Sequence, residues 1–282
     1  MDVSKLDGKT VLVTGAGSGI GQATALAFAG RGADLVICDV NEAGLSDTEK
    51  RARGLGREVF ARRVDVSSRE EMRAFAGEVH GRVEALDIVM NNAGVGMGAR
   101  FLDTTLDDWA WIVGINLMGV VHGCHFFLPP MVKRGRGGHL INVSSAAGFF
   151  ASSLLSAYST TKFGVLGLTE SLRDELAPCG IGVTAVCPGI INTPITNSSR
   201  LRGAGNTPEN RDRMVKLYQR RNYGPERVAE NVLRAVQRNR TIAPISPEAW
   251  ALWYLKRLSP RIAWFIARKF GEQEPTGGPS GQ

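Results

Sequence analysis

A doubly wound parallel α/β sheet of about seven strands, with helices on both faces, is predicted by three features of this 282-residue sequence. Short apolar runs rich in β-branched residues alternate with longer segments of helical spacing, which is typical of parallel sheets covered on both faces. A glycine-rich turn directly follows the first of these runs. The chain length suits one continuous sheet. Together these features indicate a Rossmann-type fold.

The strands and helices follow one another in order along the first half of the chain. Strands are expected at 10–14, 34–39, 58–64 and 86–91. Helices are expected at 19–30, at 41–54, and from a Ser67 cap to about Gly81, with Glu70 completing a capping box. Thr105 opens a long helix with Asp107 and Asp108 in its first turn, which the pair Pro129-Pro130 should end at about Leu128.

The second half continues the alternation. Strands are expected at 138–144 and 181–187, with a short edge strand at 240–246, and helices at 156–177 and 225–239. Residues 1–246 form a single predicted catalytic domain in which the Arg-rich segment 195–224 is a lid over the site. An amphipathic extension at 247–271 follows, split into two short helices by Ser259-Pro260. The Gly- and Pro-rich end, 272–282, is predicted to be a disordered tail.

Composition excludes several classes of protein. With 43% hydrophobic and 22% charged residues, the chain is unlike a disordered protein. No apolar run reaches the roughly 18 residues of a membrane-spanning helix, and the polar start runs straight into a strand, so a cytoplasmic protein without a signal peptide is expected. The cysteines lack C-x-x-C spacing, and His122 and His125 have no supporting ligand nearby. Free thiols and no metal site are therefore expected at Cys38, Cys124, Cys179 and Cys187.

The glycine-rich turn, Thr14 to Gly21, joins the first strand to the first helix. The helix amino end favours phosphate, Gly15 permits the tight turn, Gly19 admits a pyrophosphate and Gly21 allows close helix packing. Asp39 ends the second strand, where an acid accepts hydrogen bonds from a ribose and repels a 2′-phosphate. NAD is therefore the expected cofactor rather than NADP. The alternative is that Asp39 only caps the turn before Asn41.

A proton-transfer site is indicated by two residues one helical turn apart, Tyr158 and Lys162. A neighbouring ammonium favours the tyrosinate, so Tyr158 can exchange a proton near neutral pH. Ser145 follows the fifth strand, at the sheet edge where α/β folds build their sites. Asn116 is a polar residue in an apolar helix and calls for a buried partner.

These motifs, in this order, resemble the short-chain dehydrogenase/reductase family over about residues 5–245. The matching segments are TGAGSGIG at 14–21, Asp65, NNAG at 91–94, Asn116, Ser145, Tyr158 with Lys162, and Pro188-Gly189 followed by Thr193. The resemblance implies that Tyr158 is the general acid/base, Lys162 lowers its pKa, Ser145 holds the substrate oxygen and Asn116 supports a proton-relay water. The cofactor contacts that the motifs and the resemblance imply are Gly15, Ser18, Gly19, Ile20, Gly21, Asp39, Asp65, Val66, Asn92, Ala93, Gly94, Tyr158, Lys162, Pro188, Gly189 and Thr193.

The expected function is hydride transfer between NAD and a hydrophobic secondary alcohol or ketone, such as a steroid, retinoid or other lipid. Two alternatives are an NADP-dependent ketoacyl-type reductase and a non-catalytic dinucleotide sensor. Apolar residues in the expected pocket support a hydrophobic substrate: Val95, Met97, Phe149, Phe150, Leu154 and Leu155. An anionic group on the substrate is the less favoured option, through the lid arginines 200, 202, 211, 213, 220 and 221.

The basic excess of the chain lies in its last third. Residues 1–194 hold 18 Lys/Arg and 20 Asp/Glu, whereas residues 195–282 hold 16 Lys/Arg and 7 Asp/Glu. No nucleic-acid-binding module accompanies this charge. The tryptophan-bearing extension is expected to pack on a neighbouring subunit or over the pocket mouth, with peripheral contact of 247–270 to an anionic membrane as the alternative. The resemblance implies a homotetramer or homodimer that meets through the helices at 105–128 and 156–177.

Overall fold

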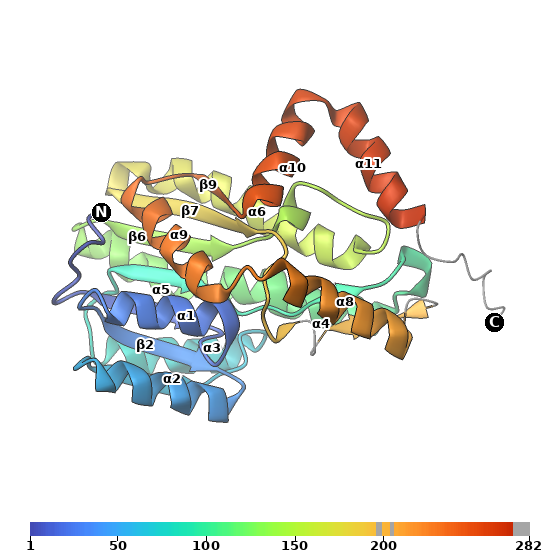
Figure 1. Cartoon of the computed structure of the whole chain (residues 1–282). Helices are drawn as coiled ribbons and strands as arrows, with labels where there is room; N and C mark the ends of the chain where they lie inside the picture. Colours follow the sequence, from blue (N-terminus) through green and yellow to red (C-terminus); the bar gives the residue numbers. More distant parts are fainter. Residues whose placement is uncertain (196–198, 204–205, 273–282) are drawn as a thin grey trace.

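A computed structural model describes residues 1–195, 199–203 and 206–272. Its centre is a parallel sheet of seven strands in the order β3-β2-β1-β4-β6-β7-β9, which confirms the predicted fold class (Figure 1). The strands are β1 (Thr10–Thr14), β2 (Asp34–Asp39), β3 (Val59–Arg63), β4 (Ile88–Asn91), β6 (Gly138–Val143), β7 (Ile181–Pro188) and β9 (Ile242–Ile245). The order reverses between β1 and β4, where doubly wound sheets open a binding crevice.

Helices cover both faces of the sheet. Val11 and Val13 of β1 join one buried cluster, with α1 (Gly19–Ala29), α2 (Glu42–Gly54) and α9 (Pro225–Gln237). Leu12, between them, joins the cluster of the other face, with α3 (Arg69–His80), α5 (Gly119–Arg134) and α6 (Ser156–Leu176). Successive strand residues point to opposite faces, so one apolar run feeds both cores.

The long helix is longer than predicted. It runs through α4 (Leu106–Val113), a π turn (Gly114–Met118) and α5 to Arg134, with Thr105 capping its start as expected. Pro129 and Pro130 lie inside α5 and do not end it. Pro130 has no N–H for the Phe126 carbonyl, and His80 Nε2 approaches that oxygen at 3.4 Å instead. The helix ends at Gly135, whose φ of 67° is left-handed.

This helix is also the one that is long and apolar enough to cross a membrane by length and composition, within the part of the chain that the structure describes. Half of its most apolar window is buried in the protein. Val120, Phe127 and Met131 pack in the core against the sheet. Its apolar character is therefore accounted for by its place in the fold.

The start of α3 differs from prediction by one residue. Ser68, and not Ser67, is the cap, and its hydroxyl accepts from the Glu71 N–H at 3.2 Å. Ser67 instead donates both its N–H and its hydroxyl to the Asp65 carboxylate. Adjacent serines are equal candidates for a cap, and Asp65 decides between them by capturing the first.

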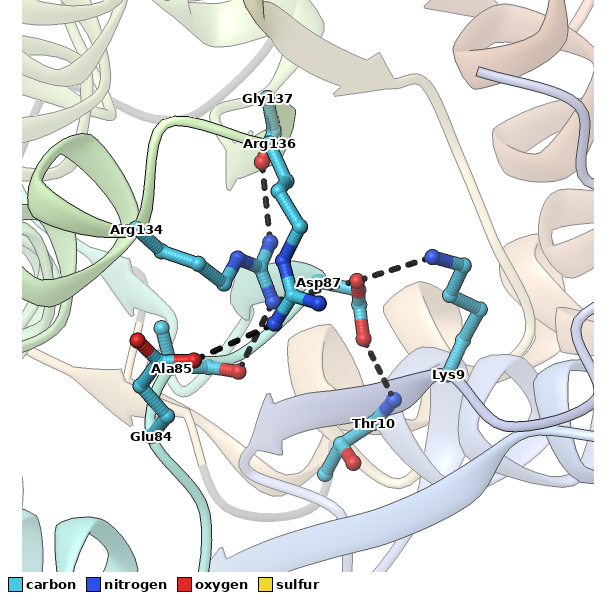
Figure 2. A network of polar contacts seen from close by, with 8 residues as sticks. All are labelled: Lys9, Thr10, Glu84, Ala85, Asp87, Arg134, Arg136 and Gly137. Carbon is cyan, nitrogen blue, oxygen red and sulfur yellow. Dashed lines mark hydrogen bonds and ion pairs between the residues drawn. The ribbon is translucent and has the colours of Figure 1, made fainter.

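A polar network closes the amino edge of the sheet, opposite the carboxyl ends of the strands (Figure 2). Asp87 accepts from the Thr10 N–H at 3.0 Å and lies 3.2 Å from the charged groups of Lys9 and Arg134. Arg134 donates to the carbonyls of Ala85 and Gly137. This network joins β1, β4 and the end of α5 around the Asp87 carboxylate, which is only 12% exposed. Its polar groups are used to hold this edge of the sheet together.

The segment after β7 covers the carboxyl edge. A short strand β8 (Arg200–Leu201) pairs with β5 (Met97–Gly98), and helix α8 (Pro208–Arg221) follows. Parts of the expected lid, 196–198 and 204–205, lie outside the described residues, as does nearly all of the expected tail. The extension forms two helices, α10 (Pro247–Leu258) and α11 (Pro260–Glu272), which stand beside the carboxyl edge at the upper right of Figure 1.

Candidate active site

The glycine-rich turn is packed so closely that side chains do not fit at its key positions. Gly15 has a φ of 66°, and a Cβ there would lie 2.7 Å from the Ala93 Cα. A Cβ on Gly21 would overlap the Gly15 carbonyl oxygen. Gly19 has a φ of 54°, and a Cβ on it would touch the Thr193 side chain at 3.3 Å. The turn therefore leaves bare backbone at the amino end of α1, which suits a phosphate group.

Two other residues of this turn have different surroundings. Ser18 is the exposed N-cap residue of α1, and its side chain makes no capping hydrogen bond. Its hydroxyl is thus positioned to donate to an anion at the helix end. Ile20 is half buried and packs against the core, so it can contribute only its backbone to a cofactor.

Asp39 makes contacts of the turn-capping kind that the sequence left open as an alternative. One carboxylate oxygen accepts from the Gly17 N–H at 2.8 Å, and the other accepts from the Asn41 N–H at 2.8 Å. The carboxylate is half buried beside the glycine-rich turn. A carboxylate has about four acceptor sites, so these two bonds leave capacity for a ribose hydroxyl pair.

The end of β4 is tied to the glycine-rich turn through Thr14. The Thr14 hydroxyl accepts from the backbone N–H groups of Asn92 and Ala93 at 3.0 and 3.1 Å. The Asn92 amide donates back to the carbonyls of Thr14 and Gly15. Gly94 comes next, and a Cβ on it would lie 3.5 Å from Lys162 Nζ. Residues 92–94 therefore join the glycine-rich turn to the part of the site that holds Lys162.

The remaining predicted cofactor contacts lie on either side of this centre. Asp65 is occupied by Ser67, and the Val66 carbonyl oxygen lies 2.9 Å from His122 Nδ1, so both are held in place by the protein. Pro188 ends β7 and Gly189 donates its N–H to Ile245 at 3.1 Å. Thr193 faces Gly19, as described above.

Tyr158 and Ser145 meet at the carboxyl edge of the sheet. Ser145 follows β6, and its hydroxyl accepts from the Ala147 N–H at 3.1 Å and lies 3.5 Å from the Pro188 carbonyl. Tyr158, in the first turn of α6, lies close enough to the Ser145 side chain for Ser145 to oppose the rise of its pKa. Two hydroxyl groups therefore converge on one point, where a substrate oxygen can contact both.

Lys162 is buried beneath Tyr158. It is 4% exposed, its Nζ donates to the Val143 carbonyl at 3.0 Å, and it lies 5.8 Å from the centre of the Tyr158 ring. Burial lowers the pKa of Lys162 to about 8. The ammonium group donates to a backbone carbonyl at the end of β6 and not to a carboxylate. With its pKa near 8, Lys162 can lose its proton near physiological pH.

Asn116 lies in the π turn and is completely buried. Its amide oxygen accepts from the Val95 N–H at 2.8 Å and its amide nitrogen donates to the Val95 carbonyl at 2.9 Å. Short π turns are frequent at functional sites. In this structure Asn116 fixes the segment after β4 directly beside Gly94 and Lys162, which is a positioning role.

The sequence predicted that the pKa of Tyr158 is lowered. In the protein without a cofactor this prediction is wrong, because the pKa is raised. Burial raises the pKa of Tyr158 to about 12, although the Ser145 side chain opposes the rise. The spacing of Tyr158 and Lys162 in the sequence indicates that a cation is near the phenol. It does not indicate how strongly burial removes the phenol from water. Tyr158 therefore carries its proton at neutral pH, which is the state that donates to a carbonyl oxygen.

Two residues at the site escaped the sequence reasoning. Tyr218 of α8 is half-buried and lies close enough to Tyr158 to raise the pKa of that phenol further. Its one visible signal is an aromatic side chain within an Arg-rich helix. Glu248, at the start of α10, accepts from the Ile190 N–H at 3.1 Å and pairs with Arg221. It resembles an ordinary helix-start acid, so no local signal marks it.

Several lid arginines are already paired with carboxylates. Arg200 and Arg202 both bind Asp108, a residue whose side chain is 2% exposed, and Arg200 also stacks on Trp111 at 3.7 Å. Among the apolar residues of the expected pocket, Met97 and Phe149 are buried in packing within the chain. These two side chains pack inside the protein and do not line an open pocket surface.

The residues present fit a nicotinamide dinucleotide. The amino end of α1 is free of side chains that would block a pyrophosphate, and Asp39 ends the neighbouring strand. The strand order reverses between β1 and β4, and the segment after β4 runs from this turn to Gly94 beside Lys162. This is the path that a dinucleotide follows in doubly wound sheets.

Comparisons with known proteins agree with this geometry. The family model for short chain dehydrogenases matches residues 9–203. The probable oxidoreductase EphD of Mycobacterium tuberculosis is 41% identical over 92% of the chain, which spans only 44% of that relative's length. Estradiol 17-beta-dehydrogenase 11 of Macaca fascicularis is 36% identical over 72% of the chain and 68% of the relative.

A crystal structure of a short chain dehydrogenase/reductase from Burkholderia phymatum in complex with NAD superposes with a TM-score of 0.81. It is 31% identical and matches 92% of this chain and 96% of its own. The family match extends from the glycine-rich turn through the Tyr158 and Lys162 pair. Sequence, fold and site geometry therefore lead to one conclusion: the chain belongs to the short-chain dehydrogenase/reductase family.

Proposed function

We propose that the protein transfers hydride between NAD and a hydrophobic secondary alcohol or ketone. The observation that carries this proposal is the convergence of the Tyr158 and Ser145 hydroxyl groups above the buried Lys162. A substrate oxygen held by both hydroxyls would gain or lose its proton at Tyr158 while hydride is exchanged at the adjacent carbon. The retained Tyr158 and Lys162 argue against a non-catalytic dinucleotide sensor.

The bound nicotinamide would supply or accept the hydride. The residues of this chain do the rest. In the reduction direction, protonated Tyr158 donates to the substrate oxygen and Ser145 donates a second hydrogen bond to the charge that develops there. Lys162, with its pKa lowered to about 8 by burial, is suited to return a proton to the Tyr158 phenolate. In the oxidation direction the same steps run backwards, with Tyr158 accepting the hydroxyl proton.

NAD is the proposed cofactor because Asp39 stands beside the glycine-rich turn. Its carboxylate already accepts two backbone N–H groups, which keeps it in place. A 2′-phosphate next to it would meet a like charge. The relative from Burkholderia phymatum was crystallised with NAD, which supports the same choice.

A hydrophobic substrate is favoured by how the lid arginines are used. Arg200, Arg202 and Arg221 are each committed to a carboxylate of the chain, so the less favoured anionic substrate loses three of its candidate partners. Tyr218 adds a further aromatic residue near Tyr158. The name of one relative, estradiol 17-beta-dehydrogenase 11, also points to a lipid-like secondary alcohol.

The test is a substrate panel with purified full-length protein. Steroid alcohols, retinol, aliphatic secondary alcohols and acyl thioester ketones are each assayed with NAD(H) and with NADP(H), following absorbance of the reduced nicotinamide. The proposal expects turnover of at least one hydrophobic alcohol or ketone with NAD(H). Turnover confined to acyl thioester ketones with NADP(H) would establish the ketoacyl-type alternative instead.

A further inference from the structure

The hairpin of α10 and α11 projects from the body of the protein (Figure 1). It carries large apolar side chains on its surface. Leu258 is 83% exposed and Trp264 is 64% exposed. Tyr254, Ile262 and Phe265 are each more than half exposed. Single exposed apolar residues need no explanation, but five on one hairpin indicate a surface that something covers.

The inner side of the hairpin is already packed within the chain. Ala249 and Ala263 are buried, and the Trp253 ring lies 5.1 Å from the Phe149 ring next to the site. Packing over the pocket mouth therefore accounts for one side of the extension only. The outer residues recur at helical spacing, as Tyr254 and Leu258 on α10 and Ile262 and Phe265 on α11. We call these four exposed residues the hairpin ridge.

Cations flank the hairpin ridge and acids do not. Residues 249–271 contain five Lys/Arg and no Asp/Glu: Lys256, Arg257, Arg261, Arg268 and Lys269. Three of these cations lie over aromatic rings: Arg257 over Trp253 at 3.8 Å, Arg268 over Trp264 at 6.0 Å and Lys269 over Phe265 at 4.9 Å. Within the described part of the chain, Lys256, Arg261 and Lys269 form no ion pair.

We propose that the hairpin ridge binds the surface of an anionic lipid bilayer. Exposed aromatic and aliphatic residues, bordered by Lys and Arg, are what an interfacial helix needs to sit in the headgroup region. An anionic surface supplies the countercharge that this segment of the chain lacks. A symmetric contact between two copies would instead place the same cations opposite one another, which is unfavourable.

Binding in this way would bring the site close to the lipid. The root of the hairpin contacts both the Phe149 ring and the loop after β7, through Trp253 and Glu248. A protein docked by Leu258 and Ile262 would therefore keep its substrate entrance beside the bilayer. Lipid binding itself does not depend on the identity of the substrate or on catalysis.

The test measures co-sedimentation of the full-length protein with vesicles, in the absence of substrate. Phosphatidylcholine vesicles containing phosphatidylglycerol are compared with vesicles of phosphatidylcholine alone. We expect binding to the anionic vesicles only, and weaker binding as salt is added. The triple variant Leu258→Asp, Ile262→Asp, Phe265→Asp should lose at least about tenfold in partitioning, and Arg261→Glu with Lys269→Glu should lose the preference for anionic vesicles.

The matched control is Leu55→Asp, which alters an equally accessible leucine, 50% exposed, after α2. It should bind vesicles as the unchanged protein does, and circular dichroism checks that every variant is folded. Absence of binding to anionic vesicles would overturn the proposal. So would a triple variant that binds normally, or one that changes only the oligomeric state in size-exclusion chromatography with light scattering, since the ridge would then be a subunit contact.

Discussion

The Ile190 backbone N–H donates to the Glu248 carboxylate over 3.1 Å. This bond joins the first turn of α10 to the loop that leaves β7 beside the proposed nicotinamide site. The same carboxylate pairs with Arg221 at the end of α8. Burial opposes ionisation of Glu248, but hydrogen bonds from Arg221 and Ser246 outweigh it and lower the pKa of the carboxyl. One side chain of the extension therefore fixes both the loop and the lid.

Replacing this carboxylate should loosen the substrate side of the site. In Glu248→Gln the amide keeps its size but loses the charge that holds Arg221, so we expect KM to rise about fivefold with a smaller change in kcat. Steady-state kinetics on the full-length protein measures the split. Glu58→Gln, at the amino edge of the sheet, is the control and should leave both constants unchanged. Kinetics of Glu248→Gln equal to those of the control would contradict the account.

Cofactor choice should depend on Asp39. Asp39→Ser keeps an acceptor for one backbone N–H but removes the negative charge beside the glycine-rich turn. The affinity for NADP relative to NAD should rise by about tenfold or more, because like-charge repulsion of the 2′-phosphate is relieved. Isothermal titration of both dinucleotides measures this ratio. If the ratio is unchanged, Asp39 serves only as the cap of its turn.

Lys162 should lower the free energy of unfolding of the protein at neutral pH. Burial lowers the pKa of Lys162 to about 8 from 10.5, so the folded state disfavours the ammonium that the unfolded chain carries freely. The cost is full below about pH 8 and disappears as the pH approaches 10.5, and it is on the order of 3 kcal/mol. Lys162→Met should thus be the more stable protein at pH 7 but not at pH 10. Urea unfolding at both values is the measurement, and an equal difference at the two would refute this view.

The start of the lid should depend on Asp108. Its buried carboxylate binds Arg200 and Arg202, whose hydrogen bonds hold its pKa at about 2. Asp108→Asn leaves two arginines without their partner and should lower the free energy of unfolding by about 1–3 kcal/mol near neutral pH. Because the folded pKa is depressed, the contribution is present above about pH 4 and falls away toward pH 2. Denaturant unfolding at pH 6 and pH 3 should therefore show a smaller difference at the lower pH.

The sequence pattern predicted those elements whose formation depends on residues close together in the chain. The strands were found because their apolar runs feed two cores, as Val11 and Leu12 do on opposite faces. The end of the long helix was wrong because His80, distant in sequence, approaches the carbonyl that Pro130 leaves unpaired. The cap of α3 was displaced because Asp65 captures Ser67.

The site was also predicted only in part. The glycine-rich turn lies between β1 and α1, and Tyr158 and Lys162 lie close together on α6, as their spacing in the sequence predicts. Tyr218 and Glu248 reach the site from later helices, and only the folded arrangement reveals their contacts. The pKa of Tyr158 was predicted in the wrong direction because burial, which no motif encodes, raises it by more than Ser145 lowers it.

Proton transfer at Tyr158 is the central claim, and Tyr158→Phe tests it most directly. With a substrate identified by the panel, turnover is measured beside NAD affinity, and Tyr254→Phe on the exposed side of α10 is the matched change. The account predicts NAD binding close to that of the unchanged protein and a turnover reduced about a thousandfold. Turnover of Tyr158→Phe equal to that of Tyr254→Phe would contradict it.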